Sequence, residues 1–347
     1  MNKTVIVDID LPKLENNLFF DPVTALPVSH TILPWCYLAR EAAKEGITMI
    51  TGDVFLAMPE KPKDALLISH MNTPRTEALI AAGARPLALF SQESPLIAFR
   101  FFFDLKKHSA RYPHTFVPAG FKSSVAQTST FHDVCFPEPY AIGAEIPGGW
   151  EDRKHLTMIS GNKRSPFTLK RLIGGLLSGR FYRELYRERL ELIRYFSDKG
   201  LDLYGMGWQK PMPGEDVPLR AAINACYRGA VDDKLATLRK YRFTITLENT
   251  CSPGYITEKI FDSIFAGSIP LYLGAPDVEK YVPAECFVDL RKFKNFAALE
   301  KHLASFTADD YKKAHTAMQQ FASSPEYARF SQEVFARELI QLIKAVQ

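Results

Sequence analysis

The stretch that decides the fold runs from residue 241 to residue 293: YRFTITLENTCSPGYITEKIFDSIFAGSIPLYLGAPDVEKYVPAECFVDLRKF. It opens with an apolar run over residues 243–247, which predicts a buried strand. A turn rich in serine, proline and glycine follows, and the pattern then predicts a helix over residues 257–266 and a second strand over residues 269–273. A strand, a helix and a second strand in this order form the repeating unit of a parallel α/β sheet.

The remainder of the chain alternates in the same way, which predicts an α/β fold throughout. Further strands are predicted over residues 47–51, 65–70, 86–91, 156–160 and 201–204, and helices over residues 34–45, 73–83, 165–199 and 232–241. Prolines and a Gly148-Gly149 pair crowd the region between residues 109 and 153, where we place a domain junction. The prediction is an N-terminal domain of residues 1–150, a C-terminal domain of residues 151–325 and a C-terminal amphipathic helix within residues 326–347.

Composition and length agree with this division and exclude several classes of protein. At roughly 150 residues per domain, a chain of 347 residues suggests two domains. The net charge of +4 is too small over this length to indicate a nucleic-acid partner. No apolar run is long enough to predict a transmembrane segment, and Asp8 and Asp10 interrupt the only candidate for a secretion signal. Five scattered cysteines without any CxxC pair favour free thiols in a reducing compartment, and we expect a cytoplasmic location.

The final helix is apolar on one face and carries charges of both signs on the other. A helix that lies on anionic lipid would be mainly basic on its polar face, so packing against a domain is the preferred interpretation.

The loop and helix after residue 247 have the composition of a phosphate site. Glu248-Asn249 end the strand, a Ser252-Pro253-Gly254 turn follows, and the helix begins near Tyr255. Ligands of parallel α/β sheets bind at the carboxyl ends of the strands, and a helix N-terminus offers free N–H groups to an anion. Lys259 would add a full positive charge there. Simpler interpretations remain: Glu258 as a partner of the helix dipole, Lys259 as a solvated lysine and Tyr255 as a core aromatic.

In their order, these residues resemble the donor-binding motif of the α1,3-fucosyltransferases, glycosyltransferase family 10. Members read approximately F-E-N-S/T, a short loop, Y-I/V-T-E-K and then A-G-x-I/V-P before a further glycine. The matching residues here are Glu248-Asn249-Thr250, Tyr255-Ile256-Thr257-Glu258-Lys259, Ala266-Gly267, Ile269-Pro270 and Gly274.

The resemblance implies a GT-B architecture with two facing Rossmann-like domains, the last helix packing back on the N-terminal domain. It also implies a GDP-fucose donor bound by the C-terminal domain, a saccharide acceptor bound by the N-terminal domain, and inversion at the transferred sugar. Asn249 and Lys259 would contact the diphosphate, Tyr255 would line the nucleotide site, and Glu258 would lie against the fucose and ribose. Glu248, in the same motif, is expected among the donor-binding residues.

A second match lies upstream, where family members carry a diphosphate-binding arginine in a helix before a strand. The spacing fits Arg189 best and leaves Arg187 as the alternative, although either could be a solvated arginine on a charged helix. Asn162 and Lys163, in MISGNK, resemble the family's entry loop to this domain and give a weaker signal.

The third match is Ser91-Gln92-Glu93-Ser94-Pro95, which resembles the family stretch that supplies the general base. Glu93 follows an apolar strand, where a carboxylate could take the proton of an acceptor hydroxyl. The alternative is an ordinary loop glutamate.

The predicted function is therefore transfer of L-fucose from GDP-fucose to a saccharide hydroxyl, with the 3-OH of GlcNAc or glucose preferred. No metal is expected, because Asp8 and Asp10 are remote in sequence from the donor motif. A different GDP-sugar and a non-catalytic glycan- or nucleotide-sugar-binding protein remain open, as do the natural acceptor and peripheral attachment to the inner face of a membrane.

Overall fold

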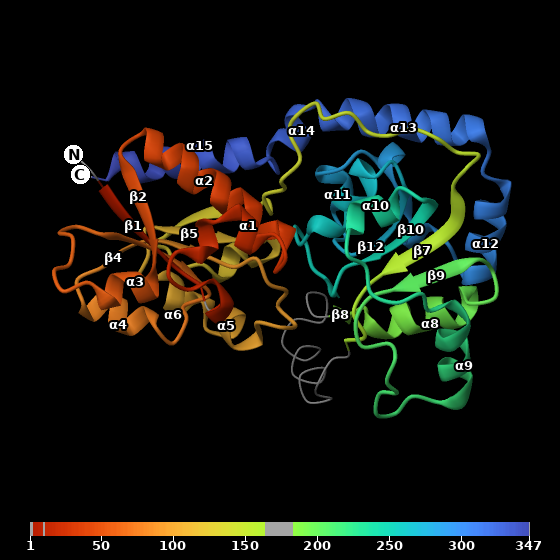
Figure 1. Ribbon diagram of the computed structural model, residues 1–347, viewed down its shortest axis with the longest axis horizontal. Coiled ribbons are helices and arrows are strands. Elements are labelled where there is room, and N and C mark those ends of the chain that lie inside the picture. Colours follow the sequence, from red (N-terminus) through yellow and green to blue (C-terminus); the bar gives the residue numbers. More distant parts are fainter. Residues whose placement is uncertain (1–2, 10, 164–182, 347) are drawn as a thin grey trace. The chain divides into compact units, whose positions relative to one another are not determined.

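The computed structural model describes residues 3–9, 11–163 and 183–346, and it divides into two compact units. Unit 1 comprises Met1–Ala141 and Ala328–Gln347, and unit 2 comprises Ile142–Tyr327 (Figure 1). The described residues do not include residues 164–182, so the first part of the helix predicted over residues 165–199 lies outside them. Asp10 lies outside them too.

Unit 1 is built on a six-stranded parallel sheet with the order β2-β1-β3-β4-β5-β6. Its strands are β1 (Lys3–Asp8), β2 (Ile47–Thr51), β3 (Leu66–His70), β4 (Arg85–Phe90), β5 (His114–Val117) and β6 (Thr130–Asp133). Its longer helices are α2 (Leu33–Lys44), α3 (Gly52–Ala57), α4 (Thr76–Ala81) and α15 (Gln332–Ala345). Ile6, Ile50 and Leu67 from three neighbouring strands join Phe55 and Leu79 from the covering helices in one apolar core. Because all six strands are parallel, their carboxyl ends lie along the same edge of the sheet.

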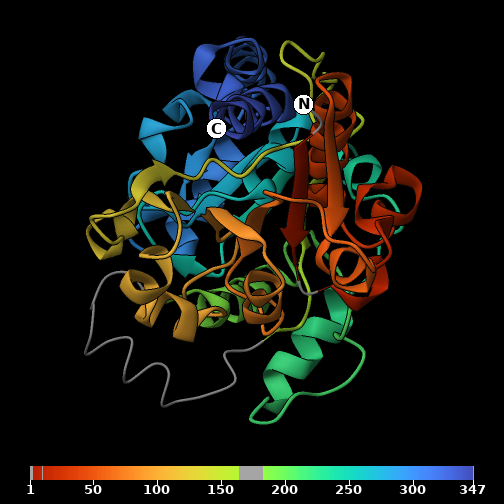
Figure 2. The same ribbon diagram turned by 90° about the vertical axis from the view of Figure 1, so that its left-hand side faces the viewer.

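The C-terminal helix packs on unit 1, as predicted. In Figure 2 the blue helix α15 lies beside the red-orange elements that begin the chain. The ring of Phe335 lies 5.1 Å from that of Trp35 on α2, and Lys344 pairs with Glu45 at 2.7 Å. The helix predicted from residue 326 is divided, however, into α14 (Pro325–Ala328) and α15. The break follows because Phe330 is buried and its carbonyl accepts a hydrogen bond from the Glu138 N–H.

Unit 2 has a second parallel sheet, with the order β13-β12-β10-β7-β9. Its strands are β7 (Lys154–Ile159), β9 (Leu201–Tyr204), β10 (Tyr241–Leu247), β12 (Ile269–Leu273) and β13 (Val288–Asp289). Its helices are α8 (Tyr186–Phe196), α9 (Val217–Cys226), α10 (Lys234–Leu238), α11 (Glu258–Phe265), α12 (Phe296–Ser305) and α13 (Ala308–Ala322). A short antiparallel pair joins β8 (Arg183–Glu184) to β11 (Thr250–Cys251). The predicted α/β fold, with two Rossmann-like sheets in one chain, is confirmed. Among the described residues, no helix combines the length and apolar character needed to cross a bilayer.

The turn after α11 depends on Gly267, which has a φ of +67°. A Cβ built there would lie 2.0 Å from the Pro147 carbonyl oxygen, and that carbonyl also accepts a hydrogen bond from the buried Arg153 at 2.9 Å. We expect Gly267→Ala to lower the free energy of unfolding by more than about 2 kcal/mol, because positive φ and overlap both oppose the methyl group. Gly214→Ala is the matched control, since Gly214 has a φ of +76° but open space around it. If urea unfolding shows that both variants lose the same free energy of unfolding, the overlap with the Pro147 carbonyl adds no cost at Gly267.

Candidate donor-binding site

Glu248 is the centre of the candidate site in unit 2. It follows β10 directly and is fully buried. Its Oε1 accepts hydrogen bonds from the Thr257 N–H at 2.9 Å and the Thr257 hydroxyl at 3.0 Å, and its Oε2 lies 3.1 Å from Lys259 Nζ. Thr257 is the N-cap of α11, so Glu248 ties the end of the strand to the first turn of the helix. The carboxylate therefore acts through other residues of the site, and this geometry gives it a positioning role.

Lys259 lies between three oxygen partners at the start of α11. Besides Glu248, its Nζ lies 2.7 Å from the Thr257 hydroxyl and 3.3 Å from Glu258 Oε1. Burial opposes its charge, but the carboxylates of Glu248 and Glu258 outweigh burial and raise the pKa of Lys259 above its usual value. Its side chain is 24% exposed, so this permanent cation remains within reach of a ligand.

Arg189 brings a second cation to the end of β10. It lies on α8 with only 5% of its surface exposed, and its Nη2 donates to the Leu247 carbonyl at 3.3 Å. Burial lowers the pKa of Arg189, while Tyr186 and Glu248 act in the opposite direction. Arginine keeps its charge in such surroundings, so the guanidinium is a buried cation next to the strand terminus.

The alternative, Arg187, is placed differently. Its side chain is 75% exposed and pairs with Glu191 one helical turn away at 2.9 Å. The structure thus separates the two candidate arginines by burial: Arg189 points toward the end of β10, and Arg187 lies on the solvent face.

This difference predicts opposite outcomes for the two arginines. Arg189→Ala should weaken GDP binding about tenfold or more, because a charge-assisted contact is lost. Arg187→Ala should leave GDP affinity unchanged and shift the free energy of unfolding by no more than about 0.5 kcal/mol. Isothermal titration with GDP measures both variants. A larger loss for Arg187→Ala than for Arg189→Ala would place the diphosphate elsewhere.

The remaining motif residues surround these charges. Asn249 is half-buried, and its carbonyl accepts a hydrogen bond from the Leu185 N–H at 3.1 Å, next to α8. Glu258 is the first residue of α11 and is partly exposed. Tyr255 is 2% exposed in the loop between them. Because Tyr255 is buried, it packs beneath the loop. Its contact with the nucleotide stays a prediction.

Several buried polar atoms have no hydrogen-bond partner among the described residues, and three of them belong to loops near these charges: Ser160 Oγ, Asn162 Oδ1 and Ser252 Oγ. They lie in the loops that follow the neighbouring strands β7 and β10. Asn162 is held by its own Nδ2, which donates to the Gly207 carbonyl at 3.2 Å. Lys163, the next residue, is exposed. Buried polar atoms are normally paired, so these unused atoms are suited to contacts with a polar ligand.

The sequence reasoning missed an ion pair beside α11. Lys234 on α10 forms a close contact with the buried Asp262, which lies one turn after Glu258 on α11. Burial opposes the charge of Lys234, but Asp262 and Glu258 raise its pKa. The hydrogen bonds of Thr257 with Glu248 and Lys259 were also missed. Threonine is a favoured N-cap residue, so the start of α11 at Thr257 was readable from the sequence. The pairing of Lys234 with Asp262 joins two helices and has no local signal.

Glu93 belongs to unit 1, where it follows β4 on a loop that is tied to its neighbours. The Gln92 N–H donates to His70 Nε2 at 3.3 Å, and the Ser91 N–H donates to the Phe116 carbonyl at 3.0 Å. Burial lowers the pKa of His70 to about 4, so the ring stays neutral and can accept that hydrogen bond. Glu93 itself is half-buried at the carboxyl edge of the sheet.

Asp8 is fully buried at the end of β1, with protein donors around its carboxylate. The hydroxyls of Thr73 and Thr76 each donate to Oδ2 at 2.7 Å, and Arg75 Nε lies 3.4 Å from Oδ1. These contacts give Asp8 a structural role that joins β1 to the start of α4.

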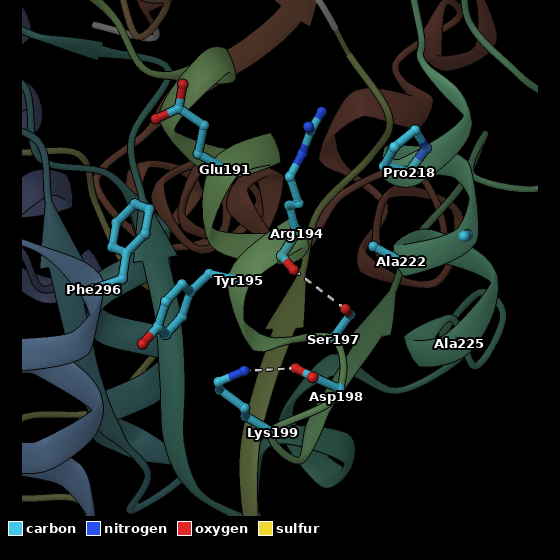
Figure 3. A pocket seen from close by; sticks show the side chains of 11 residues that line it. Glu191, Arg194, Tyr195, Ser197, Asp198, Lys199, Pro218, Ala222, Ala225 and Phe296 are labelled. Carbon is cyan, nitrogen blue, oxygen red and sulfur yellow. Dashed lines mark hydrogen bonds and ion pairs between the residues drawn. The ribbon is translucent and has the colours of Figure 1, made fainter.

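A groove of about 660 Å³ opens elsewhere on unit 2, between α8 and α9 (Figure 3). Its lining includes Tyr195, Phe296 and Lys199, and Lys199 pairs with Asp198 at 2.8 Å. Tyr195 and Lys199 precede β9, so this part of the groove lies at the amino end of that strand. It is separate from the cations gathered at the carboxyl end of β10.

Comparison with solved structures defines the class of fold. Sucrose-phosphate synthase from Thermosynechococcus elongatus superposes with a TM-score of 0.57 over 99% of this chain and 98% of its own, at 10% sequence identity. The likeness concerns the fold alone, and it agrees with the predicted GT-B class.

Comparison with sequences supports the predicted resemblance. Residues 188–338 match the family model described as glycosyltransferase family 10 (fucosyltransferase), C-terminal. An α-(1,3)-fucosyltransferase of Helicobacter pylori is 44% identical over 66 residues, which cover 19% of this chain and 14% of that protein. A putative fucosyltransferase-like protein of Arabidopsis thaliana is 33% identical over 92 residues, which cover 25% of this chain and 18% of that protein. The chain thus spans less than a fifth of either relative, and its resemblance to glycosyltransferase family 10 is confirmed.

Proposed function

We propose that this chain is an inverting glycosyltransferase that moves L-fucose from GDP-β-L-fucose to a saccharide hydroxyl and forms an α-fucoside. The preferred acceptor position is the 3-OH of GlcNAc or glucose. The observation that carries the proposal is the cluster at the carboxyl end of β10, where Arg189 and Lys259 flank Glu248 at the head of α11. The cluster falls within the part of the chain that matches the family.

In the proposed reaction, the anomeric carbon of fucose is attacked by the acceptor oxygen on the side opposite to GDP. Glu93 takes the proton of the acceptor hydroxyl, and the bond between fucose and the diphosphate breaks. Arg189, Lys259 and the N-terminus of α11 stabilise the charge that develops on the departing diphosphate. The Glu258 carboxylate stabilises positive charge on the sugar ring. The five free cysteines support a reducing compartment, so we place the reaction in the cytoplasm.

The decisive experiment is turnover of GDP-fucose with lactose or N-acetyllactosamine, with other GDP-sugars as controls. Formation of a fucosylated acceptor with GDP-fucose, and of no product with the other GDP-sugars, supports the proposal. Transfer of another sugar would keep the mechanism and change the donor. Binding of GDP without any turnover, over a panel of acceptors, would favour a non-catalytic nucleotide-sugar-binding protein.

Metal removal gives a separate expectation. Two cations and a helix N-terminus are available to the diphosphate, so activity should survive an excess of EDTA. Initial rates before and after chelation measure this. A loss of activity that Mn²⁺ restores would contradict the prediction and return attention to Asp8 and Asp10.

A further inference from the structure

The segment that follows Glu93 in unit 1 presents large apolar side chains to solvent. It forms α5 (Phe99–Phe103) and α6 (Leu105–Ser109), which connect β4 to β5. Phe103 is 63% exposed and Ile97 is 46% exposed. The ring of the half-buried Phe99 stacks on that of Phe103 at 5.9 Å and supports it from below.

Packing beneath α5 holds these rings outward. Phe101 and Phe102 are buried on the opposite side, where Phe102 lies 4.3 Å from the ring of Phe121 and Phe101 stacks on His108 at 5.7 Å. The exposure of Phe103 therefore follows from an anchored helix. A buried alternative would require Phe101 and Phe102 to leave the core.

Basic side chains accompany the apolar ones. Arg100, Lys106 and Lys107 are exposed, and none of them forms an ion pair with any residue that the structure describes. Across residues 94–122 the sequence has five lysines and arginines but only one acidic residue, Asp104. We call this set of exposed side chains the α5–α6 surface: Ile97, Arg100, Phe103, Lys106 and Lys107.

We infer that the α5–α6 surface docks on an anionic lipid bilayer. Cations next to exposed phenyl rings match a bilayer, which offers acidic headgroups above an apolar layer. A neutral saccharide would gain nothing from three unpaired cations, and a nucleic acid backbone would not bury an isoleucine beside a phenylalanine. The inference goes beyond the proposed function, because it concerns a surface in unit 1 that contributes no residue to the proposed chemistry.

Vesicle sedimentation tests the inference without any measurement of turnover. The protein should bind phosphatidylcholine vesicles that contain phosphatidylglycerol and should bind pure phosphatidylcholine much more weakly. Lys106→Glu/Lys107→Glu should weaken binding by about 30-fold or more, since each cation near an anionic surface contributes about fivefold. Phe103→Ser should weaken it by about tenfold, because a ring no longer enters the lipid. Circular dichroism confirms that the variants are folded.

Unit 2 offers matched controls. Lys312 and Lys313 are also adjacent exposed lysines, on α13, and Val217 is an exposed apolar residue on α9. Lys312→Glu/Lys313→Glu and Val217→Ser should bind vesicles as the unmodified chain does. Binding that ignores the lipid charge, or that falls equally with the control pair, would overturn the inference. Binding that needs the lysines but not Phe103 would mean a general polyanion site and would also overturn it. Turnover of a soluble acceptor by the same variants separates this outcome from the fate of the proposed function.

Discussion

Replacement of Glu93 by glutamine should lower kcat by about 10²–10⁴-fold, which is the usual contribution of a positioned general base. A sugar hydroxyl attacks poorly while it keeps its proton, and the amide of glutamine has the size of the carboxylate but cannot accept that proton. GDP affinity should stay near that of the unmodified chain, because the residues proposed to bind GDP belong to unit 2. The measurement pairs turnover with GDP titration on the same protein.

Glu60→Gln is the matched control for this experiment, since Glu60 is an exposed glutamate of unit 1 in a loop after α3. It should change neither rate nor affinity. A Glu93 variant that loses GDP affinity together with activity would make Glu93 structural. Near-normal turnover would move the base elsewhere, and Glu258 would be the next carboxylate to replace.

Lys259→Ala should weaken GDP binding by about ten- to a hundredfold, since a charge-assisted contact contributes about 1.5–3 kcal/mol. The structure adds a second expected effect. Lys259 is the cation nearest to the buried Glu248 carboxylate at 3.1 Å, so its removal should also destabilise the fold, by up to about 3–5 kcal/mol. Calorimetry with GDP and urea unfolding measure the two effects separately.

A double variant distinguishes ligand binding from folding. Glu248→Gln removes the uncompensated buried charge, so Lys259→Ala/Glu248→Gln should recover stability relative to Lys259→Ala while GDP binding stays weak. Lys240→Ala, at an exposed lysine just before β10, is the control and should be silent in both measurements. Unchanged GDP binding by Lys259→Ala would mean that the lysine serves only to neutralise Glu248, and the proposed donor site would be misplaced.

Strands were predictable where a short run rich in apolar or β-branched residues stands between clear helix and turn signals. Three predicted strands, over residues 47–51, 201–204 and 269–273, match β2, β9 and β12. By contrast β1, which lies between β2 and β3, begins with Lys3 and ends with the buried Asp8, and its short apolar run was taken only as evidence against a signal sequence. β5 and β6 contain histidines and lie among prolines, so neighbouring strands rather than their own composition define them.

The candidate site shows the same limit at the level of single residues. Spacing could nominate both Arg189 and Arg187 on α8, but only packing distinguishes the buried Arg189 from the exposed Arg187. The motif nominated Glu248 as a donor-binding residue, which stays a prediction, but it did not reveal that the carboxylate bonds to Thr257 and Lys259. Contacts of this kind depend on how a strand end meets a helix, and sequence spacing does not encode that geometry.

Among the described residues next to the first turn of α11, positive and negative formal charges balance before any ligand binds. Arg189, Lys234 and Lys259 are balanced by Glu248, Glu258 and Asp262. A neutral cluster exerts little long-range attraction on a diphosphate, so the association rate of GDP should depend only weakly on ionic strength. The same balance eases departure, because a leaving nucleoside diphosphate returns Lys259 to carboxylates that already neighbour it. Product release would then be less sensitive to salt than in a site of bare cations.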